Sequence, residues 1–151
     1  MGVLGKMEVE LDIKSSGDVF HELFGNKPHH ISNITPHKIH SCDVHEGEFG
    51  KPNSVIFWNY SVDGEKCEAK VVVEAIDEKS KLVRFKVIEG SILKEYKSFV
   101  VTLEVVDRGA ITAVKWAVEF EKFEDFGPYP VKLMDFIIGM TRDIEAHHLN
   151  E

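Results

Sequence analysis

The sequence predicts an α+β fold in which one antiparallel sheet packs against a long C-terminal helix. Three observations support this prediction. The chain opens with alternating apolar and charged residues, continues with short strand-like segments divided by turn signals, and ends with apolar residues at helical spacing. No linker, repeat or low-complexity stretch divides the sequence. Residues 1–151 are therefore predicted to form a single domain.

The first strand is predicted at residues 7–13, where apolar and charged side chains alternate with period two. This alternation indicates a strand with one face on the core and the other in solvent. Residues 15–18 (Ser-Ser-Gly-Asp) end the strand and offer N-cap residues for a short helix that reaches Phe24. A second short helix is expected over 27–33, with Pro28 in its first turn.

Six further strands are predicted in the middle of the chain. Turn signals separate them, and Asp63-Gly64 is the strongest hairpin signal among these. The connections are too short for crossover helices, so neighbouring strands are predicted to be antiparallel. The predicted strands cover residues 37–45, 54–62, 65–76, 81–88, 94–106 and 110–121.

A long helix is predicted after residues 126–128 (Phe-Gly-Pro), extending to about His148. Pro130 suits its first turn, where a missing backbone N–H costs little. Apolar residues follow at steps of three and four, which is typical of an amphipathic helix. This stripe comprises Leu133, Phe136, Ile137, Met140, Ile144 and His148.

The acidic composition argues against a nucleic-acid partner. The chain has 26 acidic residues against 18 Lys and Arg, a net charge of −8, and its lysines are scattered among acids. No apolar run approaches the roughly 18 residues of a membrane-spanning helix. Glu8, Glu10 and Asp12 interrupt any signal-peptide pattern. We expect a cytoplasmic protein without membrane insertion, in which Cys42 and Cys67 are free thiols.

No cofactor and no metal are predicted. The eight histidines show neither HxxxH nor HExxH spacing, and the two His-His pairs place adjacent rings on different sides of a helix. Residues 47–51 (Gly-Glu-Phe-Gly-Lys) superficially suggest a phosphate loop. They lack its glycine spacing and the Ser or Thr that follows its lysine, and Glu46 and Glu48 repel phosphate.

Five segments resemble plant major latex proteins, within the birch pollen allergen (pathogenesis-related class ten) superfamily of START-like domains. They are residues 45–50 (HEGEFG), 55–60 (VIFWNY), 87–90 (VIEG), 93–99 (LKEYKSF) and 115–122 (KWAVEFEK), and the resemblance covers essentially the whole chain. It implies a helix-grip fold. In that fold a curved, seven-stranded antiparallel sheet wraps around the long C-terminal helix, two short helices lie beneath it, and a large internal hydrophobic cavity remains.

Alternation along the strands selects side chains for the cavity. An apolar alternation alone indicates a packed core, and only the resemblance implies an open space. Over 65–76 the inward residues are predicted to be Ala69, Val71, Val73 and Ala75, a pattern that a one-residue bulge would invert. The predicted ligand contacts are Leu23, Ile56, Trp58, Tyr60, Val71, Val73, Val83, Phe85, Val87, Phe99, Val101, Val114, Trp116, Leu133, Phe136, Ile137 and Met140.

The cavity entrance is predicted at the loop over 46–53 and at the N-terminal end of the last helix. The entrance residues in this loop are Glu46, Gly47, Glu48, Phe49 and Gly50. Two departures from the family pattern bear on the entrance. Pro52 stiffens the loop, and the short segment 124–129 alters the opposite rim.

The resemblance implies that the partner is a small hydrophobic molecule such as a steroid, fatty acid, phenolic or hormone-like plant metabolite. A monomeric carrier associated with defence or stress is the first hypothesis. The alternative is a cavity enzyme of the isomerase or lyase type, with Tyr60, Tyr96 or Lys97 as acid or base. The facing of 94–99 is ambiguous, because Phe99 inward also places Lys97 inward unless a bulge intervenes. A third hypothesis is a defence-associated interaction protein.

Overall fold

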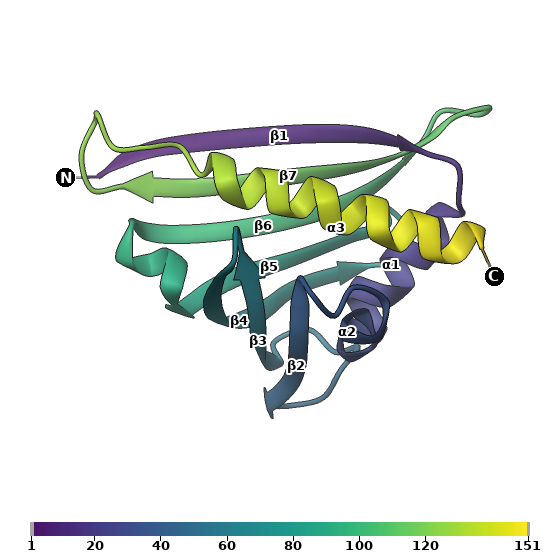
Figure 1. The fold of residues 1–151 in the computed structure, drawn as a ribbon, viewed down its shortest axis with the longest axis horizontal. Helices are drawn as coiled ribbons and strands as arrows, with labels where there is room; N and C mark the ends of the chain where they lie inside the picture. Colours follow the sequence, from purple (N-terminus) through teal and green to yellow (C-terminus); the bar gives the residue numbers. More distant parts are fainter. Residues whose placement is uncertain (1, 151) are drawn as a thin grey trace.

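The computed structural model describes residues 2–150 and contains one curved antiparallel sheet of seven strands (Figure 1). The order across the sheet is β1-β7-β6-β5-β4-β3-β2, and every neighbouring pair is antiparallel. The antiparallel prediction is therefore confirmed. The strands are β1 (Val3–Ile13), β2 (Ile39–Glu46), β3 (Val55–Val62), β4 (Glu65–Asp77), β5 (Leu82–Gly90), β6 (Tyr96–Asp107) and β7 (Thr112–Lys122).

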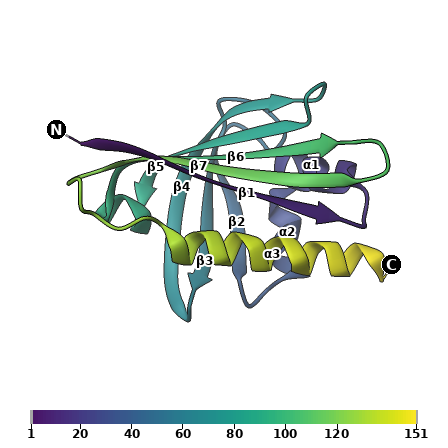
Figure 2. The ribbon, with the colours of Figure 1, turned by 90° about the horizontal axis from the view of Figure 1, so that it is seen from above.

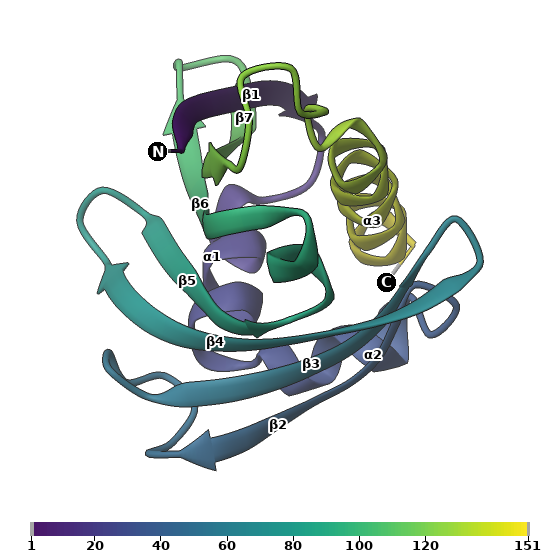
Figure 3. The ribbon, with the colours of Figure 1, turned by 90° about the vertical axis from the view of Figure 1, so that its left-hand side faces the viewer.

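The long helix α3 (Val131–Leu149) lies along the concave side of the sheet, which curves around it (Figure 3). The chain passes from β1 at one edge to β2 at the other through α1 (Gly17–Asn26), the 3₁₀ turn η1 (Pro28–His30) and α2 (Ile31–Ile34). A further 3₁₀ turn, η2 (Ser91–Lys94), joins β5 to β6. Seen from above, α3 crosses β2, β3 and β4 and passes beside α2 (Figure 2). The helix-grip fold is confirmed.

Several boundaries differ from the predicted ones. β1 begins at Val3, because β7 continues to pair with it as far as Lys122. The predicted helix over 27–33 is split into a 3₁₀ turn and a single α-helical turn. Ser16 is the N-cap of α1, and its side chain accepts a hydrogen bond from the Asp18 backbone N–H.

The prediction that Ala75 points inward is wrong because β4 contains an irregularity. Val73 pairs with Phe85, but Ala75 pairs with Arg84 and Ile76 with Val83. The register therefore shifts by one residue between Val73 and Ala75, and Ile76 packs against the core instead.

The helix α3 buries a broader face than the predicted stripe. Met134 and Thr141 are buried although neither belongs to the stripe, whereas Phe136 is only half-buried. The Thr141 hydroxyl accepts a hydrogen bond from Trp116 Nε1 on β7 at 3.0 Å and donates one to the Ile137 carbonyl at 2.7 Å. Both polar groups are buried, so this pair fixes the depth at which the helix sits against the sheet.

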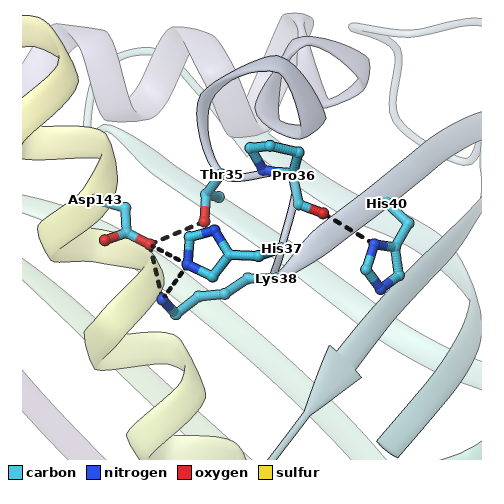
Figure 4. A network of polar contacts seen from close by, with 6 residues as sticks. All are labelled: Thr35, Pro36, His37, Lys38, His40 and Asp143. Atoms are coloured by element: carbon cyan, nitrogen blue, oxygen red, sulfur yellow. Dashed lines mark hydrogen bonds and ion pairs between the residues drawn. The ribbon is translucent and has the colours of Figure 1, made fainter. Parts of the chain in front are cut away.

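A polar network fastens the C-terminal half of α3 to the segment between α2 and β2 (Figure 4). Asp143 Oδ2 accepts hydrogen bonds from Thr35 Oγ1 and Lys38 Nζ, each at 2.8 Å, and lies 3.6 Å from His37 Nε2. Burial alone would raise the pKa of the Asp143 carboxyl. The bonds from Lys38 and Thr35 outweigh burial, so its pKa is held below the ordinary value of 3.8.

We predict that Asp143→Asn lowers the free energy of unfolding at neutral pH by about 1 kcal/mol. A carboxyl whose pKa is lower in the folded state adds stability above its unfolded pKa, and this stability is lost as the pH falls through the folded pKa. The difference between wild type and variant should therefore shrink below about pH 4. Urea unfolding across pH measures it. Asp135→Asn, at an exposed position on the same helix, is the control and should change stability little.

A second prediction concerns Gly90, which ends β5 with φ of 134°. A Cβ atom there would lie 2.3 Å from the Glu68 carbonyl oxygen, which is backbone and cannot move aside easily. Gly64 has φ of 82° but nothing within 4 Å of its Cβ position. Gly64→Ala should therefore cost about 1 kcal/mol through backbone strain alone, and Gly90→Ala at least about twice that. Equal melting temperatures for Gly64→Ala and Gly90→Ala would contradict the prediction that the Glu68 carbonyl clashes with a side chain at position 90.

Candidate functional site

An apolar chamber of about 110 Å³ lies between α3, α1 and the concave face of the sheet. Tyr60 contributes the hydroxyl group and Trp116 and Trp58 the indole N–H groups of a lining that is otherwise hydrocarbon and thioether. The chamber is lined by Phe24, Ile39, Trp58, Tyr60, Ala69, Val71, Phe85, Val87, Ile92, Phe99, Val101, Trp116, Leu133, Phe136, Ile137 and Met140.

Both tryptophans of the chain lie in this lining. Trp116 meets the Phe24 ring edge-on with 5.0 Å between ring centroids, and Trp58 meets Phe85 in the same manner at 6.3 Å. The Trp116 N–H is already bonded to Thr141. Because these rings are held by specific partners, the chamber has stiff aromatic walls.

Most of the predicted ligand contacts line the chamber, but five do not. These five are buried, and α1 packs on the end of the sheet that carries several of them. A Cβ at Gly25 of α1, for example, would lie 3.6 Å from Val83 and 3.4 Å from Ile76. The five that belong to packed core and not to the chamber wall are Leu23, Ile56, Val73, Val83 and Val114.

Four lining residues were absent from the predicted contacts. Ala69 follows the same alternation as Val71 and could have been included on that pattern. Phe24 lies on the amphipathic helix α1, whose buried face was not assigned to the cavity. Ile39 and Ile92 lie at a strand start and in the 3₁₀ turn η2, where no periodic signal exists.

The chamber adjoins a wider groove of about 660 Å³, and Tyr60, Ile92 and Leu133 line both spaces. The groove lies between the β3–β4 hairpin, η2 and the N-terminal end of α3. Its charged residues balance, and Lys132 Nζ lies 3.6 Å from Asp63 Oδ2 across it. These charged residues are Lys66, Lys94, Lys132, Asp63, Glu65 and Glu95.

Residues 128–130, before α3, form one rim of this groove, and two buried side chains hold the segment that contains them. The Tyr96 hydroxyl donates a hydrogen bond to the Pro128 carbonyl at 2.8 Å. Lys122 Nζ donates to the Asp125 carbonyl at 2.9 Å and lies 4.6 Å from the centroid of the Tyr129 ring. The segment 124–129, where the sequence departs from the family pattern, therefore contains part of the groove rim.

Tyr60 lies where the chamber and the groove adjoin, a position that we call the neck. Its side chain is 8% exposed and packs against the Phe136 ring at 5.6 Å. Among residues 2–150 its hydroxyl has no hydrogen-bond partner. Burial, and secondarily the neighbouring Cys67, raises the pKa of the Tyr60 hydroxyl. At neutral pH this group is therefore a neutral donor facing open space.

An irregularity in β6 decides which side chains of residues 94–99 face the concave side of the sheet. Tyr96 pairs with Lys122 and Ser98 with Glu121, so one residue of β6 is left over between them. Tyr96 is consequently buried together with Phe99, and Lys97 is exposed, with its Nζ 5.9 Å from the Phe123 ring. Of the three predicted acid–base candidates, Lys97 lies outside the chamber and Tyr96 is bonded to Pro128.

The predicted entrance loop borders neither of these two spaces. Glu46, Gly47, Glu48, Phe49 and Gly50 line neither the chamber nor the groove. The Phe49 ring instead stacks on His29 of η1, with 4.1 Å between centroids. This contact closes the β2–β3 loop against the short helices. The other predicted border, the N-terminal end of α3, does line the groove.

Within the part of the chain that the structure describes, no group of three or more His, Cys, Asp or Glu side chains is arranged to hold a metal ion. In the same residues no helix is long and apolar enough to cross a membrane.

Comparison with known proteins identifies relatives over nearly the whole chain. The chain is 45% identical over 149 residues to MLP-like protein 31 of Arabidopsis thaliana, covering 97% of this chain and 87% of that protein. It spans about half the length, 48% and 45%, of two further Arabidopsis relatives, MLP-like proteins 34 and 28.

Solved structures agree with this likeness. The crystal structure of ginseng major latex-like protein 151 from Panax ginseng superposes with a TM-score of 0.95 at 51% identity, covering 98% of this chain and 99% of that one. Norcoclaurine synthase from Thalictrum flavum shares the fold at 17% identity, with a TM-score of 0.76 over 99% of this chain and 89% of that one. Residues 2–151 match the Pathogenesis-related protein Bet v 1 family, and the chain belongs to that family, on its major latex protein side.

Proposed function

We propose that this protein is an intracellular carrier of small hydrophobic plant metabolites that also carry a polar group. The observation that supports this most directly is the apolar chamber, which adjoins at Tyr60 a groove with charged walls. An apolar pocket with few polar groups favours ligands whose tail is buried and whose head is oriented by hydrogen bonds.

The volume of the chamber limits what enters it. At about 110 Å³ it is somewhat smaller than apolar cavities of about 150 Å³ that bind benzene. It therefore accommodates an alkyl chain or a single ring, and the rest of a larger ligand has to occupy the groove. Fatty acids, phenolics and hormone-like metabolites fit this division better than a rigid steroid, whose fused rings exceed the chamber.

Moderate affinity follows from the same geometry. Apolar burial contributes roughly 25 cal/mol per Å², while association and ordering cost about 4–15 kcal/mol. Only part of a ligand lies in the chamber, so dissociation constants near micromolar are expected. Such affinities suit reversible loading and release by a carrier.

The arrangement of polar groups favours a carrier over an enzyme of the isomerase or lyase type. Norcoclaurine synthase, which has been crystallised with dopamine and hydroxybenzaldehyde, shows that this fold holds small aromatic molecules in another protein. Here, however, Lys97 is exposed and Tyr96 is bonded to Pro128. Among the residues that the structure describes, Tyr60 alone lines the chamber as a titratable group. Acid–base chemistry in a single site usually needs both a proton donor and an acceptor. The defence or stress association, the cytoplasmic location and the monomeric state rest on the resemblance and remain predictions.

The carrier function is tested with 8-anilino-1-naphthalenesulfonate and with intrinsic tryptophan fluorescence. We expect the wild type to bind this dye with micromolar affinity and nonanal or nonanoic acid to displace it. Because Trp58 and Trp116 line the chamber, entry of a ligand should also change the tryptophan emission. Ala69→Phe fills the chamber and should weaken dye binding at least about tenfold, or by about 1.4 kcal/mol.

Ala117→Phe is the matched control, because Ala117 lies between inward-facing Trp116 and Val118 on the outer face of β7. It should leave dye affinity unchanged, and melting curves establish that both variants fold. Unchanged binding by Ala69→Phe, or failure of the wild type to bind any of these compounds, would contradict the proposal.

A further inference from the structure

Cys67 lines the groove beside Tyr60, and the carrier function does not account for either polar group. The two residues are cross-strand partners on β3 and β4, where they share the concave face of the sheet. Cross-strand partners have Cβ atoms about 5 Å apart. The Cys67 thiol therefore lies next to the phenol ring at the neck of the chamber.

Each of the two groups is available to a ligand. Cys67 is half-buried, and its thiol makes only a long contact of 3.6 Å with the Glu65 carbonyl. The Tyr60 side chain is more than nine-tenths buried, and its hydroxyl has no hydrogen-bond partner among residues 2–150, although protein atoms do not fully enclose this hydroxyl. The hydroxyl is therefore free to donate a hydrogen bond to a ligand acceptor at the neck.

The other cysteine has a different environment. Cys42 is 5% exposed, pairs with Trp58 across β2 and β3, and lines neither space. Burial, and secondarily Asp43, raises the pKa of the Cys42 thiol, which disfavours the reactive thiolate. The chain thus offers one thiol at a ligand site and one inert thiol for comparison.

We propose that Cys67 is a covalent capture site for amphipathic α,β-unsaturated carbonyl compounds, with Tyr60 donating a hydrogen bond to the carbonyl oxygen. This inference rests on the proposed carrier function, since the alkyl tail has to enter the chamber. The conjugated double bond of such a compound lies between the carbonyl and the tail. If the carbonyl sits in the groove and accepts the bond from Tyr60, the double bond is placed at the neck, beside Tyr60 and its cross-strand partner Cys67.

The reaction is a conjugate addition. The Cys67 sulfur attacks the carbon β to the carbonyl and forms a C–S bond, while the electron pair of the double bond moves toward the α carbon and the carbonyl oxygen. The hydrogen bond from Tyr60 stabilises the enolate charge on that oxygen. The thiol proton passes to solvent and solvent returns one to the α carbon, so the whole aldehyde or ketone is added with no oxidant, reductant or leaving group.

The test compares trans-2-nonenal with its saturated counterpart nonanal. Intact-mass spectrometry and peptide mapping should find one aldehyde added at Cys67, faster than to glutathione under the same conditions. The adduct should be absent in Cys67→Ser and unchanged in Cys42→Ser. Tyr60→Phe should slow addition by about tenfold or more, because it removes the donor to the developing enolate. Iodoacetamide alkylates a thiol without forming an enolate. In the Tyr60→Phe variant it should therefore modify Cys67 at the wild-type rate.

The outcomes separate this inference from the carrier function. If nonanal displaces the dye but trans-2-nonenal modifies only lysines, or modifies Cys67 no faster than glutathione, the capture site is refuted and the carrier stands. Equal addition rates in wild type and Tyr60→Phe also refute the role of Tyr60. If neither aldehyde displaces the dye and no Cys67 adduct forms, both proposals fall.

Discussion

The site depends on how α3 is held against the sheet. The C-terminal half of the helix is fastened by Thr141 to Trp116, by Asp143 to Lys38, and by Glu145 to the backbone N–H of Lys14 at 2.6 Å. The N-terminal half has no comparable set of polar contacts with the sheet among the described residues. It presents Leu133, Phe136, Ile137 and Met140 to an open chamber instead. The helix is thus anchored to its surroundings at its C-terminal end and borders the chamber at its N-terminal end. The curvature of the sheet leaves room for this chamber between the helix and the strands.

This arrangement creates two environments that meet at Tyr60. The chamber is apolar and stiff, because its tryptophans are held by specific partners. The groove is wider, carries balanced charges, and has a rim held by the buried side chains of Tyr96 and Lys122. A molecule that satisfies both environments needs an apolar tail and a polar head. The unpartnered Tyr60 hydroxyl at the neck adds a preference for an acceptor at the junction.

The sequence was sufficient for most of the fold because the responsible signals are local. Period-two alternation, the Asp63-Gly64 turn and the three- and four-residue steps of the last helix each depend on residues close in the chain. The errors occurred where a strand departs from regular pairing. The wrong inward assignment of Ala75 and the ambiguous facing of 94–99 both fall where an extra residue shifts the register, and alternation alone cannot reveal where such a shift falls.

The sequence by itself determined which side chains are apolar and face the concave side of the sheet, and the resemblance carried by its segments determined the family. Only the tertiary structure decided which of those side chains border empty space. Val83 and Phe85 follow the same alternation, but α1 packs near Val83, whereas Phe85 borders the chamber. The tertiary structure also packs Phe49 of the predicted entrance loop on His29, and the space that adjoins the chamber is the groove beside Tyr60 and Cys67. The physical reason is that an unfilled space depends on distances between elements far apart in the chain, which no local pattern encodes.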